Sequence, residues 1–137
     1  MIVKQISIFV ENKHGRLADV TGILAANNID IKALSIADTV DFGILRIIVD
    51  KPEEAEIALK EAGLTVSITS VLAVAIDDTP GGLAECLRLL SDNSIPIEYA
   101  YAFVSQTVNK ACVILRIEND LKAMEILKEA GYTALEV

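Results

Sequence analysis

The chain has 137 residues, of which 12 are basic and 20 acidic, so its net charge at neutral pH is −8. An acidic chain without a basic stripe is a poor nucleic-acid binder, because neutralised phosphates supply most of that affinity. No apolar run reaches the roughly 18–20 residues of a membrane span, and the first residues lack the regions of a signal peptide. We therefore expect a cytoplasmic protein with neither nucleic acid nor a membrane as partner.

In chain order, the first half predicts a strand, a helix, two strands, a second helix and a last strand. Ile6, Ile8 and Val10 recur at every second position, which is the period of a strand. Pro52 is typical of a helix start, and Gly63 is the expected left-handed stop of the same helix. The expected ranges are residues 4–10, 16–27, 30–38, 43–50, 52–62 and 65–69.

The second half of the chain repeats the first. Residues 81–102 match residues 15–36 at an offset of 66, and the match resumes at an offset of 68, where residues 128–131 repeat the Lys-Glu-Ala-Gly of residues 60–63. A period near 67 is too long for a solenoid unit and suits one small domain. The expected second-half strands cover residues 71–76, 97–106, 111–118 and 133–137, and the helices cover residues 83–93 and 121–130.

The order βαββαβ in each half predicts an α+β fold of two ferredoxin-like units, each an antiparallel sheet with both helices on one face. We place the domains at residues 1–69 and 70–137, with Ser70 alone between the last strand of one and the first strand of the next. The sheet face without helices is apolar, so we expect a homodimer that covers it, in preference to rings that merely touch loops. The rings on this face are Phe9, Tyr99, Tyr101 and Phe103.

Few residues suit catalysis. His14 is the only histidine, and Cys86 and Cys112 fall among apolar residues, as small buried hydrophobic side chains do. Glycine patterns of nucleophile elbows, phosphate loops and dinucleotide sites are missing. Asp77 and Asp78 form a carboxylate pair, but they precede a helix, where acidic residues commonly act as caps. We expect no enzyme, no cofactor and no metal site, and an enzyme built on this pair is the last alternative.

The same element order occurs in RNA-recognition domains and metal carriers. The third strands here, residues 43–50 and 111–118, lack the interleaved aromatic and basic residues of the former, and the loops lack the cysteine pair of the latter. What remains is the turn ENKHGRL at residues 11–17 and its copy DDTPGGL at residues 77–83. With the following helix and the segments NNIDI and NSIPI, these turns resemble the ACT domain over almost the whole chain. Residues 5–49 are also similar to the regulatory subunit of acetolactate synthase.

ACT domains are small regulatory modules that bind amino acids and control enzymes of amino-acid metabolism. The resemblance therefore implies a non-catalytic sensor of a free amino acid, bound between a turn and a second strand, with a metabolic enzyme as partner. Backbone N–H groups at Arg16 and Leu17 would hold the carboxylate at the helix start, with Gly82 and Leu83 as the matching pair in the second turn. Asn12 would hold the ammonium group. The implied ligand-binding residues are Asn12, His14, Gly15, Arg16, Leu17, Ser35, Ile36, Ala37, Asp78, Gly81, Gly82, Leu83, Tyr101, Ala102 and Phe103.

The two turns depart from the family pattern in different ways. His14 stands where proline is usual, while Arg16 can reach a carboxylate; the second turn keeps the Pro-Gly pair but carries Asp77 and Asp78, which repel an anion. Occupation of one turn or of both stays open. In the alternative interpretation, Asn12 and Asp78 only shape the turns and cap the helices, and the fold is a structural or oligomerisation module without a ligand.

Overall fold

The structure is a computed structural model and describes residues 1–38, 41–103 and 109–134. It has the predicted α+β fold, with antiparallel strands and two helices in each half. The described strands are β1 (Ile2–Glu11), β2 (Ile31–Asp38), β3 (Phe42–Val49), β4 (Thr65–Asp77), β5 (Tyr99–Ala102) and β6 (Lys110–Arg116). The described helices are α1 (Arg16–Ala26), α2 (Pro52–Glu61), α3 (Gly82–Asp92) and α4 (Asp120–Glu129).

The chain divides into two compact units. The first unit is Lys4–Thr69, and the second combines Met1–Val3 with residues 70–134 of the described chain. Met1 belongs to the second unit because its carbonyl oxygen accepts a hydrogen bond of 2.8 Å from the Ala73 N–H. The domain limits at residues 69 and 70 stay a prediction.

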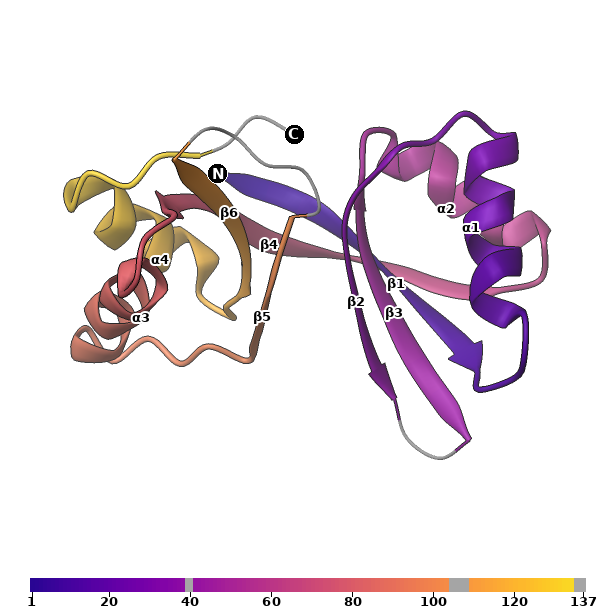
Figure 1. The fold of residues 1–137 in the computed structure, drawn as a ribbon, viewed down its shortest axis with the longest axis horizontal. Coiled ribbons are helices and arrows are strands. Elements are labelled where there is room, and N and C mark those ends of the chain that lie inside the picture. The colour runs from indigo at the N-terminus through magenta and orange to yellow at the C-terminus, as the bar shows by residue number, and fades with distance from the viewer. Residues whose placement is uncertain (39–40, 104–108, 135–137) are drawn as a thin grey trace. The chain divides into compact units, whose positions relative to one another are not determined.

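In the first unit the strand order is β2-β3-β1-β4, and α1 and α2 cover one face of this sheet (Figure 1). Strand alternation decides which face is covered, because Ile6 and Ile8 point to the same side as their partners Ile47 and Leu45 on β3. All four side chains are buried beneath the helices. The helix residues that complete this core include Val20, Leu24, Ala55 and Leu59.

The second unit repeats this arrangement with β4 beside β6, β6 beside β5, and α3 and α4 on one face (Figure 1). Its core is formed by Leu72, Val74 and Leu115 of the sheet together with Leu90 and Leu127 of the helices. The two cysteines of this unit are buried free thiols, as the sequence predicted.

Most expected strand limits agree with the structure to within one or two residues, and the larger differences are three. The strands predicted on either side of Ser70 form one strand, β4, because β-branched residues, which favour strands, continue on both sides of this serine without a turn residue. Of the strand predicted at residues 97–106, β5 covers Tyr99–Ala102, and the Phe103 N–H continues the pairing with a hydrogen bond of 3.0 Å to the Cys112 carbonyl oxygen, while residues 104–108 lie outside the described chain. Of the last predicted strand, Thr133 forms an isolated bridge with Ala75, while residues 135–137 lie outside the described chain.

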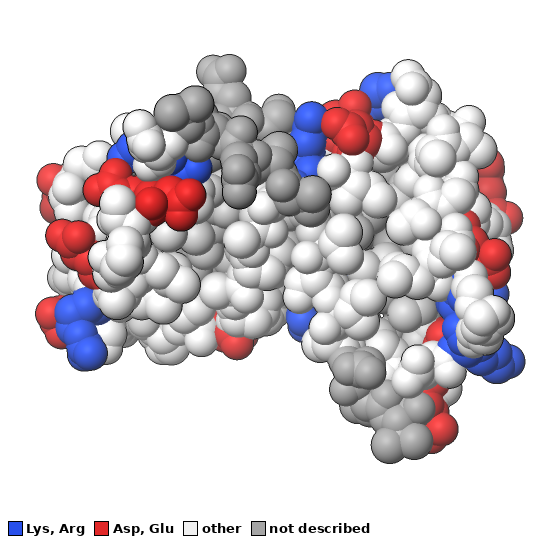
Figure 2. Space-filling model, viewed as in Figure 1, with Lys and Arg blue, Asp and Glu red and all other residues white. Residues whose placement is uncertain are grey.

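Acidic and basic side chains alternate along the margins of the face drawn in Figure 2, and they form no continuous basic surface there. None of the four described helices is long and apolar enough to cross a membrane. No group of three or more histidine, cysteine, aspartate and glutamate side chains is placed to hold a metal ion in the described part of the chain.

Candidate functional site

Each strand-to-helix turn ends in a glycine that the backbone requires. Gly15 caps the start of α1 with φ 80°, and Gly81 caps the start of α3 with φ 89°. These are left-handed conformations that glycine adopts without the steric cost that other residues meet. No atom lies within 4 Å of the place that a Cβ on either glycine would take, apart from the neighbouring residues. The backbone at both helix starts is therefore open to close approach.

The two turns also share their backbone hydrogen bonds. The Arg16 N–H donates to the Lys13 carbonyl oxygen over 3.2 Å, and the Gly82 N–H donates to that of Thr79 over 3.0 Å. These are two of the N–H groups that the sequence suggested for a carboxylate, and they already have partners within the turn. A bound carboxylate would have to share or displace these bonds, so the side chains around the turn carry more of any recognition.

A cavity of about 220 Å³ lies beside the first turn. It is enclosed by the end of β1, the turn, the start of α1 and one residue of β2, together with the beginning of β3. Its lining residues are Val10, Glu11, Asn12, Lys13, Arg16, Leu17, Ile36, Gly43 and Leu45.

Four residues predicted for the first site line this cavity: Asn12, Arg16, Leu17 and Ile36. The other four, His14, Gly15, Ser35 and Ala37, do not line it. For the two strand residues the reason is the pleat of β2. Ile36 faces the same side as its partner Leu45, whereas Ser35 and Ala37 lie opposite Arg46 and Ile44 on the other face.

Sequence reasoning missed five lining residues, namely Val10, Glu11, Lys13, Gly43 and Leu45. Glu11 and Lys13 belong to the turn at residues 11–17. Charged residues beside a glycine-capped helix start could have indicated that they line the site. Gly43 and Leu45 come from β3, which reaches the turn because β1 pairs with it, Val10 opposite Gly43. The only sequence feature that could have indicated that β3 lies close to the turn was the glycine at the start of this β-branched strand.

The charges around the first cavity favour an anion. The Lys13 ammonium is bonded to the Glu11 carboxylate at 2.7 Å, and the Arg16 guanidinium lies 3.8 Å from the same carboxylate. The hydrogen bond from Lys13 is the main cause that lowers the pKa of Glu11, so this carboxyl group stays ionised. Two cations thus face one carboxylate, and one positive charge remains uncompensated.

The second turn has the opposite balance. Asp77 is paired with Lys110, and Asp78 adds a further exposed carboxylate. Gly82 is buried, while Gly81 and Leu83 are exposed.

On β5 the pleat again selects one candidate of three. Ala102 lies opposite Val113, which belongs to the core beneath the helices, so Ala102 is the counterpart of Ile36. Tyr101 is on the other face, where its ring stacks with Tyr99 at a centroid distance of 6.4 Å. Phe103 continues the Tyr101 side of the strand by alternation.

Comparison with known proteins identifies the family of this chain. The family described as "ACT domain pair" matches residues 1–135. The crystal structure of protein BT0572 from Bacteroides thetaiotaomicron is 45% identical and superposes with a TM-score of 0.92, covering 98% of this chain and 92% of that one.

Two more distant structures share the fold. The regulatory subunits of aspartate kinase from Thermus thermophilus and Thermus flavus are 17% and 18% identical, with TM-scores of 0.68 and 0.65. They cover 96% and 95% of this chain, and 97% and 95% of their own length is covered. A search of the curated proteins gives no match. The similarity of residues 5–49 to the acetolactate synthase subunit stays a prediction. With a family match over residues 1–135, the chain belongs to the ACT domain pair family.

Proposed function

We propose that this protein senses a small free amino acid at the first turn and thereby regulates, or associates with, an enzyme of amino-acid metabolism. The observation that carries the proposal is the cavity of about 220 Å³ at a glycine-capped helix start, lined by Lys13, Arg16 and Asn12. This volume is about that of seven water molecules in the liquid, which is enough for a small amino acid. Membership of the ACT domain pair family supports the same function.

The lining residues supply a partner for each part of an amino acid. Lys13 and Arg16 offer charge-assisted hydrogen bonds to the carboxylate, which are about twice as strong as neutral ones. Asn12 and Glu11 carry side-chain oxygens that accept from the ammonium group. Leu17 and Ile36 have exposed side chains in the free protein, and a ligand's aliphatic carbons would cover them.

We place the ligand at the first turn and not at the second because of charge. A zwitterion needs an uncompensated cation for its carboxylate, and the first turn has one. At the second turn Lys110 is already paired with Asp77, and Asp78 adds repulsion. Of the one-site and two-site interpretations that the sequence left open, this charge balance favours a single site at the first turn.

The enzyme partner rests on analogy at the level of the fold. The Thermus proteins that share this fold are regulatory subunits of aspartate kinase, so a regulatory chain of this shape acting on an enzyme has precedent. We propose no catalysis by the chain itself. Co-purification of one metabolic enzyme with the full chain, in an amount that changes when the sensed amino acid is added, is the expected result.

We also propose that the protein is a homodimer through the apolar faces of its sheets. Phe9 and Phe42 contact each other with ring centroids 5.4 Å apart, yet their side chains are 50% and 45% exposed. Contiguous exposed apolar groups on a sheet face are a mark of an interaction surface. A structural module without a ligand would use the same face, so dimerisation alone does not separate the two functions.

A thermal-shift screen of the full chain against the twenty amino acids makes that separation. A ligand present at 100 times its Kd stabilises the folded state by about 2.7 kcal/mol, which raises Tm by several degrees. A selective rise for one or a few amino acids supports the sensor. A flat profile at millimolar concentrations would leave the structural module as the function.

A further inference from the structure

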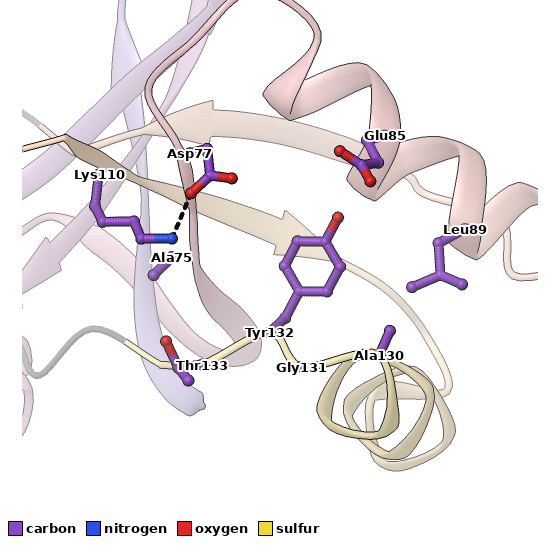
Figure 3. A pocket seen from close by; sticks show the side chains of 9 residues that line it. All are labelled: Ala75, Asp77, Glu85, Leu89, Lys110, Ala130, Gly131, Tyr132 and Thr133. Carbon is purple, nitrogen blue, oxygen red and sulfur yellow. Dashed lines mark hydrogen bonds and ion pairs between the residues drawn. The ribbon is translucent and has the colours of Figure 1, made fainter.

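A second cavity, of about 330 Å³, lies within the second unit, apart from the first turn and sharing only Asp77 with the second turn (Figure 3). It opens between α3, the segment that follows α4, and the ends of β4 and β6. The residues that line it are Ala75, Asp77, Glu85, Leu89, Lys110, Ala130, Gly131, Tyr132 and Thr133. Every one of them belongs to the described part of a single unit.

The cavity carries one uncompensated negative charge. Asp77 is neutralised by its ion pair with Lys110, drawn as a dashed line in Figure 3. Glu85 forms no side-chain hydrogen bond or ion pair with any residue among 1–38, 41–103 and 109–134. Figure 3 shows the Tyr132 hydroxyl directed toward the Glu85 carboxylate across the cavity. Two oxygen acceptors therefore converge on the same space.

Tyr132 keeps its proton over the whole physiological range. Burial raises the pKa of this phenol, and the negative charges of Glu85 and Asp77 act in the same direction. Its oxygen is therefore a neutral acceptor beside the charged one. Leu89 and Ala130 provide an apolar surface on one side of the cavity, and Ala75 lines it beside Lys110 (Figure 3).

The first unit has different residues at the corresponding positions. Phe9 stands in place of Ala75, and Phe42 in place of Lys110; these two rings contact each other at 5.4 Å. Leu64 replaces Tyr132, so the phenol oxygen is missing as well. The second repeat has exchanged bulky apolar groups for a small residue, a paired cation and a hydroxyl, which is a change toward a polar binding site.

We propose that this cavity binds a small organic monocation, namely a primary ammonium group on a short aliphatic body. The ammonium group donates to the Glu85 carboxylate and to the Tyr132 hydroxyl oxygen. Its aliphatic carbons lie on Leu89 and Ala130. Most ligand sites combine such an apolar wall with a few polar groups in this way.

The charge pattern also excludes a zwitterion from this cavity. A carboxylate would need Lys110, which is held by Asp77, and it would otherwise lie among carboxylates. The site therefore selects against free amino acids and for amines. It is independent of the amino-acid site at the first turn, and either assignment can fail without the other.

The test uses n-butylammonium chloride with the full-length protein, followed by the NMR chemical shifts of Tyr132 and Leu89. Sodium butyrate and n-butanol are the matched anionic and neutral probes. We expect saturable shifts with butylammonium alone. Equal chemical-shift changes with butyrate would overturn the proposal. So would the absence of any chemical-shift change with butylammonium at millimolar concentrations in large excess over the protein.

Three variants test which groups bind the ammonium group. Glu85 is exposed, so Glu85→Gln should fold normally, and the loss of a charged hydrogen-bond partner should weaken butylammonium binding about tenfold or more. Asp19→Asn, at the corresponding position of the first unit, is the control and should leave the Kd unchanged. Tyr132→Phe keeps the ring and should weaken binding by a smaller factor. If Glu85→Gln binds butylammonium as tightly as the parent, the assignment is wrong.

Discussion

Gly82 lies against the carbonyl group of Asp77, so closely that a Cβ on Gly82 would stand 2.1 Å from that carbonyl oxygen. The corresponding residue of the first repeat is Arg16, whose Cβ and long side chain are accommodated. The two turns therefore share their backbone hydrogen bonds but differ in the room beside the first helical residue. The first turn is open where the second is closed, in agreement with the cavity found beside Arg16.

Gly82→Ala should destabilise the protein by about 1–3 kcal/mol, because a backbone carbonyl must move to admit the methyl group. Helix propensity alone predicts the opposite sign, since alanine is favoured over glycine in a helix by up to about 1 kcal/mol. Arg16→Ala is the matched control and should change the free energy of unfolding by less than about 0.5 kcal/mol. Urea unfolding followed by circular dichroism measures both. A Gly82→Ala protein as stable as the parent would disprove the close contact.

The buried thiol of Cys112 should make stability fall in alkaline solution. Burial raises its pKa from 9.0 to about 11, so between these values the folded state holds a proton that the unfolded state has lost. The free energy of unfolding therefore decreases as pH rises through this window, by about 2 kcal/mol between pH 7.5 and 10.5.

The comparison with Cys112→Ala isolates this thiol from other groups that titrate in the same range. The variant loses a constant packing contribution at every pH, so only the slope matters. Urea unfolding at pH 7.5, 9 and 10.5 should show the parent losing stability relative to the variant. Parallel pH profiles for the two proteins would show that the thiol of Cys112 does not titrate differently in the folded state.

The proposed homodimer predicts a defined change in mass. The chain has a mass of 14.7 kDa, and the parent should elute as a species of about twice that mass. Tyr101→Glu combined with Phe103→Glu places charge on the apolar sheet face, which should yield a monomer or insoluble protein. Leu121→Glu is the control, because Leu121 is 64% exposed on α4. Size-exclusion chromatography with light scattering decides, and an unchanged dimer in the double variant would refute this interface.

Much of the fold was predictable because both repeats obey strong local rules. Gly63 has the expected left-handed φ, 86°, and Pro52 begins α2. The repeat doubled the information, since each ambiguous element could be compared with its copy. The end of β5 was less predictable. An apolar run such as Tyr99–Phe103 contains no residue that ends a strand, so the end of β5 depends on its pairing with β6.

The candidate site was predicted in part for the same reason. Asn12 and Leu17, which are near Arg16 in sequence, line the cavity. Strand residues depend on the pleat, which a one-residue shift reverses, so Ile36 lines the cavity while Ser35 and Ala37 do not. The role of all these residues in binding stays a prediction. Gly43 and Leu45 of β3 could be predicted as lining residues only if the order of the strands in the sheet was known.

Charge at Gly15 tests most directly whether an amino acid binds at the first turn. Substitution at Gly15 strains the backbone because φ is 80°, so a change to aspartate alone would mix strain with charge. Asparagine has nearly the same shape and tolerates positive φ comparably, which makes Gly15→Asn the matched control for Gly15→Asp. Gly81→Asp places the same charge at the second turn.

The measurement is calorimetric titration of the four proteins, the parent included, with the amino acid that the thermal-shift screen selects. Gly15 does not line the cavity but precedes Arg16 in the chain, so a carboxylate there should compete with the ligand's carboxylate for the cations and weaken binding by about 1–3 kcal/mol, or roughly 5- to 150-fold. We predict this loss for Gly15→Asp, with Gly15→Asn and Gly81→Asp binding nearly as tightly as the parent. If Gly15→Asp folds and binds as tightly as Gly15→Asn, the ligand lies elsewhere and the proposed site is wrong.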